Sequence, residues 1–297
     1  MELSYALLRL LPKNTLSRAV GAACRVNAPR PVVRAVIRAF ARKYGVDASE
    51  AERPIEEYPT FTEFFTRRLK PGARPIAPGE LLPVSPVDGT VGELGEVVDG
   101  RAYQAKGKHY SLAELIGGPD APGDAAQFLG GTFVTIYLAP YNYHRIHAPL
   151  GGEISGYVNM PGQLWPVNPI GVRNVEKLFC VNERLTTFVK TPRGACAVVA
   201  VGATNVGRIR AVYDDVVTNA KRTRKPARKF YERTIRVEKG GEIAIFEMGS
   251  TVVVLFAPGV KLASRLAVGQ PIKLGEALEE ERASPATGGG REAGAPR

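Results

Sequence analysis

The sequence predicts an α+β fold in which a mainly β core follows amphipathic N-terminal helices. Two observations predict it. From about residue 82 onward, short runs rich in valine, isoleucine, threonine and aromatic residues are bounded by glycine or proline, which is the pattern of β-strands. Ahead of that point, residues 4–45 carry apolar residues at three- and four-residue steps, which is the period of a helix.

The N-terminal helical segment combines an apolar face with a basic edge. Apolar residues recur at helical steps at Val32, Val33, Val36, Ile37 and Phe40. Basic residues fall mostly on the flanks and the opposite side: Arg34, Arg38, Arg42 and Lys43. This pattern is typical of a helix lying at a membrane surface. A helix packed on the domain with a solvated basic face would show the same pattern.

A short further helix is expected where Thr60 stands three residues before Glu63, because that spacing is a capping box. The helix would carry Phe61, Phe64 and Phe65. Prolines and glycine in residues 71–78 then predict a loop that leads into the β part of the chain.

Five stretches in the second half predict strands: residues 131–138, 186–191, 196–203, 242–246 and 251–256. An internal echo accompanies them. S-P-V-D-G-T-V begins at Ser85 and A-P-L-G-G-E-I at Ala148, 63 residues later, and each reads as a turn feeding a strand. With G-Q-P-I-K-L-G-E-A-L near the end, the echo is similar to the barrel-sandwich domains that carry lipoyl or biotinyl groups. A duplicated barrel-sandwich core and an undivided β core both remain open.

The basic segment at residues 221–233 carries seven cations, and its position within the β part predicts a loop, either mobile or simply solvated. Residues 281–297 are rich in alanine, glycine and proline, which predicts a disordered tail.

Composition limits the class of partner and the compartment. The net charge of +11 calls for an anionic partner, either a nucleic acid or an acidic lipid surface. Three scattered cysteines suit a reducing compartment better than a disulfide framework. No run of about 18 apolar residues and no secretory pattern is present. The expected location is therefore cytoplasmic, with association at a membrane surface.

Two of the three histidines, His144 and His147, stand together between Pro140 and Pro149. On a strand their side chains would point to opposite faces, whereas on a helical turn they would share one. The bracketing prolines favour a short turn that directs both imidazoles into one pocket. A zinc site is a competing use, but a third ligand is not evident, so we expect no metal.

Asp88 and Ser250 complete the set of candidates. An aspartate before glycine most often forms a turn, and its functional use would be to orient a histidine. Ser250 stands in G-S-T-V, which does not match the G-x-S-x-G nucleophile elbow because Val252 occupies the last glycine position. By itself the triplet leaves the role of Ser250 open.

A series of motifs runs along nearly the whole chain, to about residue 278. In order they are F-T-E-F-F-T-R-R-L-K-P-G-A-R-P-I, S-P-V-D-G-T-V, K-G-K-H-Y-S-L-A-E-L, Y-N-Y-H-R-I-H-A-P, P-G-Q-L-W-P-V-N, N-E-R, V-G-A-T-N-V-G and M-G-S-T-V-V-V-L-F-A-P-G. Taken together, they closely resemble the phosphatidylserine decarboxylase family. The usual L-G-S-T of the family reads M-G-S-T here, which conserves side-chain volume.

The resemblance implies that Ser250 attacks the carbonyl of Gly249, cleaves the chain there and becomes a pyruvoyl group, the only cofactor expected. That group would form a Schiff base with the amine of phosphatidylserine and release CO2 and phosphatidylethanolamine. By the same resemblance, His147 is the base that activates Ser250, Asp88 holds the tautomer of His147, and Thr251 supports the oxyanion. His144 would protonate the substrate carbon.

The implied partners are an anionic phospholipid membrane, the phosphatidylserine substrate, the β and α fragments of the same chain, and a second copy in a homodimer, with no nucleic acid. The enzyme would lie peripherally on the cytoplasmic face of the bacterial cell membrane. Residues 1–50 would associate with the membrane, residues 51–280 would form the catalytic domain, and residues 281–297 the tail. Three apolar side chains would flank the acyl chains or pack in the core: Met160, Leu164 and Trp165.

Two rival functions remain at this stage. A non-catalytic lipid- or nucleic-acid-binding β protein would use its charge alone and keep an intact chain. A serine hydrolase with the same triad would be labelled at Ser250 by fluorophosphonates without fragmentation.

Overall fold

The computed structural model of the chain describes residues 12–105, 108–117, 125–204, 208–220, 225–247 and 251–280. An eight-stranded antiparallel sheet forms its centre. In spatial order its strands are β10 (Ala227–Val237), β6 (Gly152–Met160), β7 (Arg184–Thr191), β8 (Gly194–Val201), β12 (Thr251–Phe256), β4 (Thr132–Tyr137), β1 (Gly89–Glu96) and β13 (Pro271–Ile272). The five predicted strand stretches are confirmed as β4, β7, β8, β11 (Glu242–Phe246) and β12.

Two apolar layers cover the central sheet. Along β12, Val252 and Val254 belong to one hydrophobic cluster, whereas Val253 and Leu255 belong to the other. Because successive side chains of a strand point to opposite faces, both faces of β12 are buried, and its sequence reads as an unbroken apolar run. The strand that begins at Thr251 is therefore held rigidly on both sides.

A different set of elements covers each face. One face packs against the three-stranded sheet of β5 (Arg145–His147), β11 and β9 (Ile209–Ala211). The other packs against α5 (Leu112–Ile116) and α8 (Leu178–Val181). The hairpin of β2 (Arg101–Ala105) and β3 (Lys108–Ser111) and the helix α7 (Pro169–Asn174) contribute to the same side as these two helices.

The duplication suggested by the sequence echo is visible in the backbone hydrogen bonds. Ser85 exchanges two of them with the Gly275–Glu276 turn, and Ala148 exchanges the same two with the Gly240–Gly241 turn. Ser85 and Ala148 are 63 residues apart, whereas the two turns that they bind are 35 residues apart. The strand order is likewise symmetric about the β8–β12 pair, because β13, β1 and β4 on one side correspond to β10, β6 and β7 on the other. The hydrogen-bond pattern supports a duplicated β core.

The two equivalent turns both pack against the side chain of Ile76. Gly240 and Gly275 both have left-handed backbone conformations, with φ of 75° and 88°. A Cβ atom on either residue would come within 2.9 Å of the Ile76 side chain. Each of these two turns therefore requires glycine for two reasons: its backbone conformation is left-handed, and a Cβ atom would collide with Ile76.

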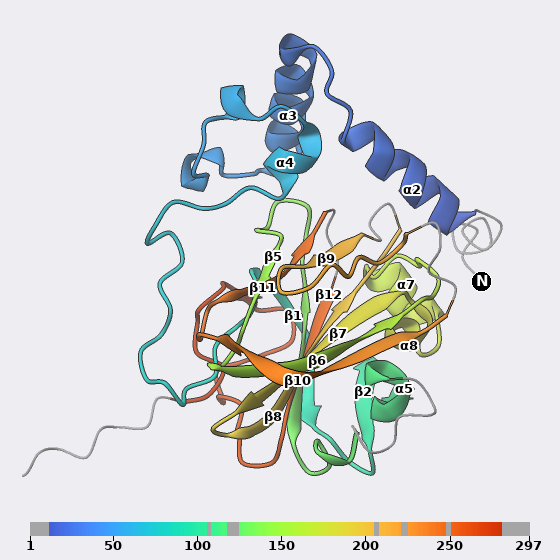
Figure 1. Cartoon of the computed structure of the whole chain (residues 1–297), viewed down its shortest axis with the longest axis vertical. Coiled ribbons are helices and arrows are strands. Elements are labelled where there is room, and N and C mark those ends of the chain that lie inside the picture. The colour runs from blue at the N-terminus through green and yellow to red at the C-terminus, as the bar shows by residue number, and fades with distance from the viewer. Residues whose placement is uncertain are drawn as a thin grey trace, which may run out of the picture.

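The N-terminal helices form a separate layer. They are α2 (Lys13–Cys24), α3 (Arg30–Tyr44), the 3₁₀ turns η1 (Ala48–Glu50) and η2 (Ile55–Glu57), and α4 (Phe61–Phe65). Figure 1 shows α2, α3 and α4 at one end of the β core, next to the end that carries β5 and β9. The predicted short helix is confirmed with Thr60 as its N-cap, since the Thr60 side chain accepts a hydrogen bond from the Glu63 backbone N–H. The Glu63 carboxylate pairs with Arg53.

The apolar stripe of α3 is divided between two surroundings. Val33 and Ile37 are buried with Tyr58 and Phe64 in a third hydrophobic cluster, whereas Val32 and Val36 are exposed. That cluster joins residues on both sides of the expected boundary at residue 50. The sequence pattern alone could not separate the packed valines from the exposed ones.

The prediction of a loop at residues 221–233 was wrong for its second half. Residues 227–233 belong to β10, the edge strand that pairs with β6, while residues 221–224 lie outside the described part of the chain. Lysine and arginine are common on edge strands because their charge opposes pairing with another sheet. The predicted tail at residues 281–297 also lies outside the described residues.

Candidate functional site

The predicted site residues come from β5, from the start of β1 and from the segment that joins β11 to β12. The backbone of Phe246, at the end of β11, donates to the His144 carbonyl at 2.9 Å. The same strand continues toward Gly249 and Ser250, which lie outside the described residues, and the description resumes at Thr251. The topology thus brings the histidine segment next to the chain that leads into the predicted cleavage site.

The two histidines have different surroundings, because residues 145–147 form a short strand rather than the expected turn. His144 is fully buried, and neither of its ring nitrogens makes a hydrogen bond of ordinary geometry to the described residues, although the backbone of Asn142 lies close enough to act on its pKa. Its ring stacks on Phe65 of α4 with a centroid distance of 4.0 Å. Burial, assisted by the positive charge of Arg67, lowers the pKa of His144 to about 3. The imidazole is therefore neutral at pH 7.

His147 is held by two hydrogen bonds. Its Nδ1 lies 2.7 Å from the carbonyl oxygen of Gly240, and its Nε2 lies 3.2 Å from the hydroxyl of Tyr143. Since a carbonyl only accepts, Nδ1 carries the proton and Nε2 keeps its lone pair. Burial lowers the pKa of His147 from its usual value. The ring is thus neutral, with Nε2 available as a base.

The buried carboxylate of Asp88 is bound by Arg74 and by the Leu274 backbone. Arg74 holds its carboxylate bidentately, with nitrogen–oxygen distances of 2.8 and 2.7 Å, and the Leu274 backbone N–H donates at 2.9 Å. The other edge of the Arg74 guanidinium binds Glu50. Asp88 therefore makes no hydrogen bond to His147 among the described contacts, and the Gly240 carbonyl holds the histidine tautomer in its place. A planar guanidinium matches a carboxylate better than an imidazole does.

Thr251 is buried at the first position of β12, where it pairs with Tyr137 of β4 and Val201 of β8. Its hydroxyl oxygen has no hydrogen-bond partner among the described residues. A buried hydroxyl is normally satisfied, so an unsatisfied one next to a predicted reactive residue is a feature that needs an explanation.

The three apolar candidates pack in the protein interior. Leu164 is fully buried, Trp165 belongs to the second hydrophobic cluster, and Met160 packs against it. The ammonium group of Lys13 in α2 lies 3.8 Å from the centre of the Trp165 ring. This placement corresponds to core packing beneath α2, the second of the two uses expected for these residues.

Four polar residues near the site were not singled out from the sequence. Arg67 and Arg74 stand in the quoted arginine-rich stretch, and Tyr143 stands beside His144. Glu183, of the N-E-R motif, is buried, and burial raises its pKa to about 7. The sequence around Arg67 and Arg74 gave no signal of their partners, which come from other segments of the chain.

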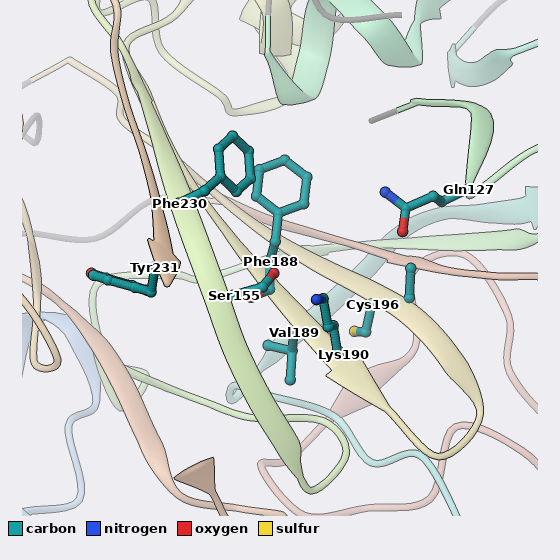
Figure 2. A pocket seen from close by; sticks show the side chains of 9 residues that line it. Gln127, Ser155, Phe188, Val189, Lys190, Cys196, Phe230 and Tyr231 are labelled. Atoms are coloured by element: carbon teal, nitrogen blue, oxygen red, sulfur yellow. Dashed lines mark hydrogen bonds between the residues drawn. The ribbon is translucent and has the colours of Figure 1, made fainter. Parts of the chain in front are cut away.

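Two cavities of the described β core lie away from these residues. Figure 2 shows one of about 230 Å³, in which Phe188 of β7 and Phe230 of β10 lie ring against ring, with Cys196 and Lys190 nearby. A wider groove of about 820 Å³ borders Ile76 and Lys239. Neither of the two is lined by His144, His147 or Thr251.

Comparison with known proteins decides the family. A family model described as phosphatidylserine decarboxylase matches residues 61–280, and a second, described as PSD, matches residues 3–45. The chain belongs to the phosphatidylserine decarboxylase family. The enzyme is therefore a decarboxylase, as the sequence motifs predicted.

Several curated relatives match most of this enzyme's length. One from Anaeromyxobacter sp. (strain K) is 56% identical over 280 residues, which cover 93% of this chain and 98% of the relative. One from Myxococcus xanthus (strain DK1622) is 54% identical over 85% of this chain and 88% of its own. One from Brevibacillus brevis is 44% identical over 95% and 99%. Each is named a phosphatidylserine decarboxylase proenzyme.

Proposed function

We propose that this enzyme cleaves its own chain between Gly249 and Ser250, acquires a pyruvoyl group at position 250, and converts phosphatidylserine to phosphatidylethanolamine and CO2. The relatives named as proenzymes support processing of this kind. The observation that carries the proposal is a pair of buried polar side chains, His144 and Thr251, that have no well-formed hydrogen bond to the described residues. Thr251 follows the predicted cleavage site in the sequence, and the His144 carbonyl accepts from the Phe246 backbone at the end of β11.

These side chains fit a carbonyl group at position 250. The Thr251 hydroxyl is a free donor adjacent in the chain, and the ring nitrogens of His144 are free to donate to or accept from a bound molecule. A pyruvoyl group would supply a ketone that takes the substrate amine and draws off the electrons released as CO2 leaves. Without such a partner, the Thr251 hydroxyl and the His144 ring nitrogens would have lost hydrogen bonds to water without forming well-made ones in the protein.

Self-cleavage needs a base, because a serine hydroxyl is a poor nucleophile while protonated. The lone pair of His147 Nε2 supplies that base, and the Gly240 carbonyl holds the ring in the required tautomer. Ser250 Oγ attacks the Gly249 carbonyl carbon, an ester replaces the peptide bond, and elimination releases a β fragment ending at Gly249. Addition of water and loss of ammonia leave the ketone at the start of the α fragment. Asp88 contributes through its charge rather than through contact.

In turnover, the substrate carbon that loses CO2 needs a proton. His144 is the proposed donor: its ring, neutral at rest, takes up a proton during turnover and gives it to that carbon, in a site shielded from water. Thr251 supports the oxyanion during cleavage through its hydroxyl or its backbone N–H. Denaturing mass spectrometry of the active protein tests the proposal: two chains support it, and a single unmodified chain of 32.0 kDa opposes it.

The exposed face of α3 supports attachment to an anionic membrane. Val32 and Val36 are 53% and 49% exposed, and basic side chains flank them. Among the described residues, no helix has the length and apolar character needed to cross a bilayer. We propose that α2 and α3 lie on the cytoplasmic face of the cell membrane, and that the enzyme acts there as a homodimer, as the family resemblance implies.

Replacing Val32 and Val36 together with glutamate is expected to weaken binding to anionic vesicles by about 10-fold or more, because it removes apolar burial and adds negative charge. Vesicle cosedimentation measures the effect. Folding should be unaffected, since both side chains are exposed. Val98→Glu is the matched control, because Val98 is 62% exposed on the β core. Equal binding by the double variant and the control would refute the assignment of this face.

A further inference from the structure

A buried arginine next to α4 forms no ion pair with the described residues. Arg67 is 3% exposed, and its Nη2 donates to the Tyr141 carbonyl at 3.1 Å. Its Nε and Nη1 have no hydrogen-bond partner among the described residues. Burying a guanidinium without an anion is costly, and buried charges are normally paired.

The neighbouring carboxylates do not pair with Arg67. Asp88 and Glu50 both bind Arg74, with shortest nitrogen–oxygen distances of 2.7 and 2.8 Å. Arg74 is therefore a doubly paired cation, while Arg67, within range of the same carboxylates, donates to neither. The free edge of Arg67 is left for an anion from outside the described chain.

Arg67 lies beside the proposed proton donor. Phe65 stacks on the His144 ring at 4.0 Å, and the Thr66 carbonyl accepts from Arg145 Nε at 2.9 Å. Residues 65–67 thus run along residues 141–145, and the charge of Arg67 acts on the His144 ring. The ring nitrogens of His144 also make no hydrogen bond of ordinary geometry within the described part of the chain. Two buried side chains with unused polar atoms therefore meet at one place.

We propose that Arg67 binds an anionic oxygen of the phosphoserine headgroup, so that α4 and the residues after it form one wall of the substrate site. Carboxylate and phosphodiester share this chemistry, and a guanidinium suits either. The inference rests on the proposed function, since it names the part of the substrate that this site holds. An anion at Arg67 would also offset the charge that opposes protonation of His144, which links headgroup binding to proton donation.

The test compares Arg67→Gln with Arg68→Gln, because Arg68 is the adjacent arginine in the sequence and is exposed. With short-chain phosphatidylserine as substrate, R67Q is expected to raise KM about 10- to 100-fold, the effect of losing one charge-assisted hydrogen-bonded pair. R68Q should leave KM unchanged. Arg67→Lys keeps the positive charge but loses the paired N–H donors of the guanidinium, so its KM should lie between those of R67Q and R68Q. A KM for R67Q equal to that of R68Q would overturn the proposal.

Inhibition by short-chain phosphatidylethanolamine separates the two anions. The product keeps the phosphate and lacks the carboxylate. If Arg67 binds the carboxylate, R67Q leaves the inhibition constant of the product unchanged; if it binds the phosphate, that constant rises together with KM.

A binding measurement without turnover keeps this inference separate from the pyruvoyl proposal. In the Ser250→Ala background, calorimetric titration with short-chain phosphatidylserine should show the same 10- to 100-fold loss on adding R67Q. Equal dissociation constants with and without R67Q would overturn the headgroup assignment. A failure of the pyruvoyl proposal would appear instead as an uncleaved wild-type chain that still responds to R67Q.

Discussion

Ser250→Ala is expected to leave one chain of 32.0 kDa with no detectable decarboxylation, a loss of at least about 10⁴-fold. The substitution removes the oxygen that attacks Gly249, so neither the cleavage nor the ketone can form. Denaturing electrophoresis and CO2 release measure the two losses together. Folding should be retained, because alanine differs from serine by one oxygen atom.

A matched control is Ser155→Ala, at a half-buried serine of β6 in the wall of the smaller cavity, which should be processed and active like the wild type. A Ser250→Ala chain that is cut at the normal position would contradict the assignment of the nucleophile. Activity without cleavage would contradict the assignment of the cofactor.

His147→Ala and His144→Ala are expected to separate the two stages of the chemistry. His147→Ala removes the base that activates Ser250, so the chain should remain whole. His144→Ala should still cleave itself, but its kcat should fall by about 10²- to 10⁴-fold, because the carbon that loses CO2 no longer receives its proton from a positioned acid. Mass spectrometry follows cleavage, and single-turnover CO2 release follows the second stage.

The third histidine supplies the control for this pair. His109 of β3 is exposed, and His109→Ala should change neither stage. Loss of cleavage in His144→Ala would move the role of base from His147 to His144. Normal cleavage in His147→Ala would remove His147 from the first stage altogether.

The β core was largely predictable because most of its central strands are runs of β-branched and aromatic residues bounded by glycine or proline. β12 reads as an unbroken apolar run, since both of its faces are buried by separate clusters. β10 was mistaken for a loop, because an edge strand keeps its charged residues in solvent and shows neither alternation nor an apolar run. The equivalent turns at Gly240 and Gly275 could be suspected from the echo but not established, since their match lies in backbone hydrogen bonds.

The helical layer shows a different limit. A single stripe on α3 predicted one apolar face, but Val33 and Ile37 pack inward while Val32 and Val36 face outward. The sequence period gives the face of a helix, whereas the position of its neighbours determines how much of that face is covered. Packing on the domain is therefore confirmed for Val33 and Ile37, whereas membrane contact through Val32 and Val36 stays a prediction.

The candidate site was predicted by resemblance more than by pattern. The histidine pair and Ser250 carried weak signals of their own, and the family motifs supplied their roles. The partner of Asp88 could not be foreseen, because Arg74 reaches it from a proline-rich loop and also binds Glu50. Nor could the sequence indicate that Arg67 would be buried without a partner, which depends on how residues 65–67 lie against residues 141–145.

The covalent state of residue 250 in active, purified protein tests the central claim most directly. Denaturing mass spectrometry, with and without a hydrazine reagent that reacts with ketones, is the measurement. The account predicts two chains, residues 1–249 and residues 250–297, of which only the second gains the mass of one hydrazone. An active enzyme that remains a single unmodified chain of 32.0 kDa and does not react with the reagent would contradict it.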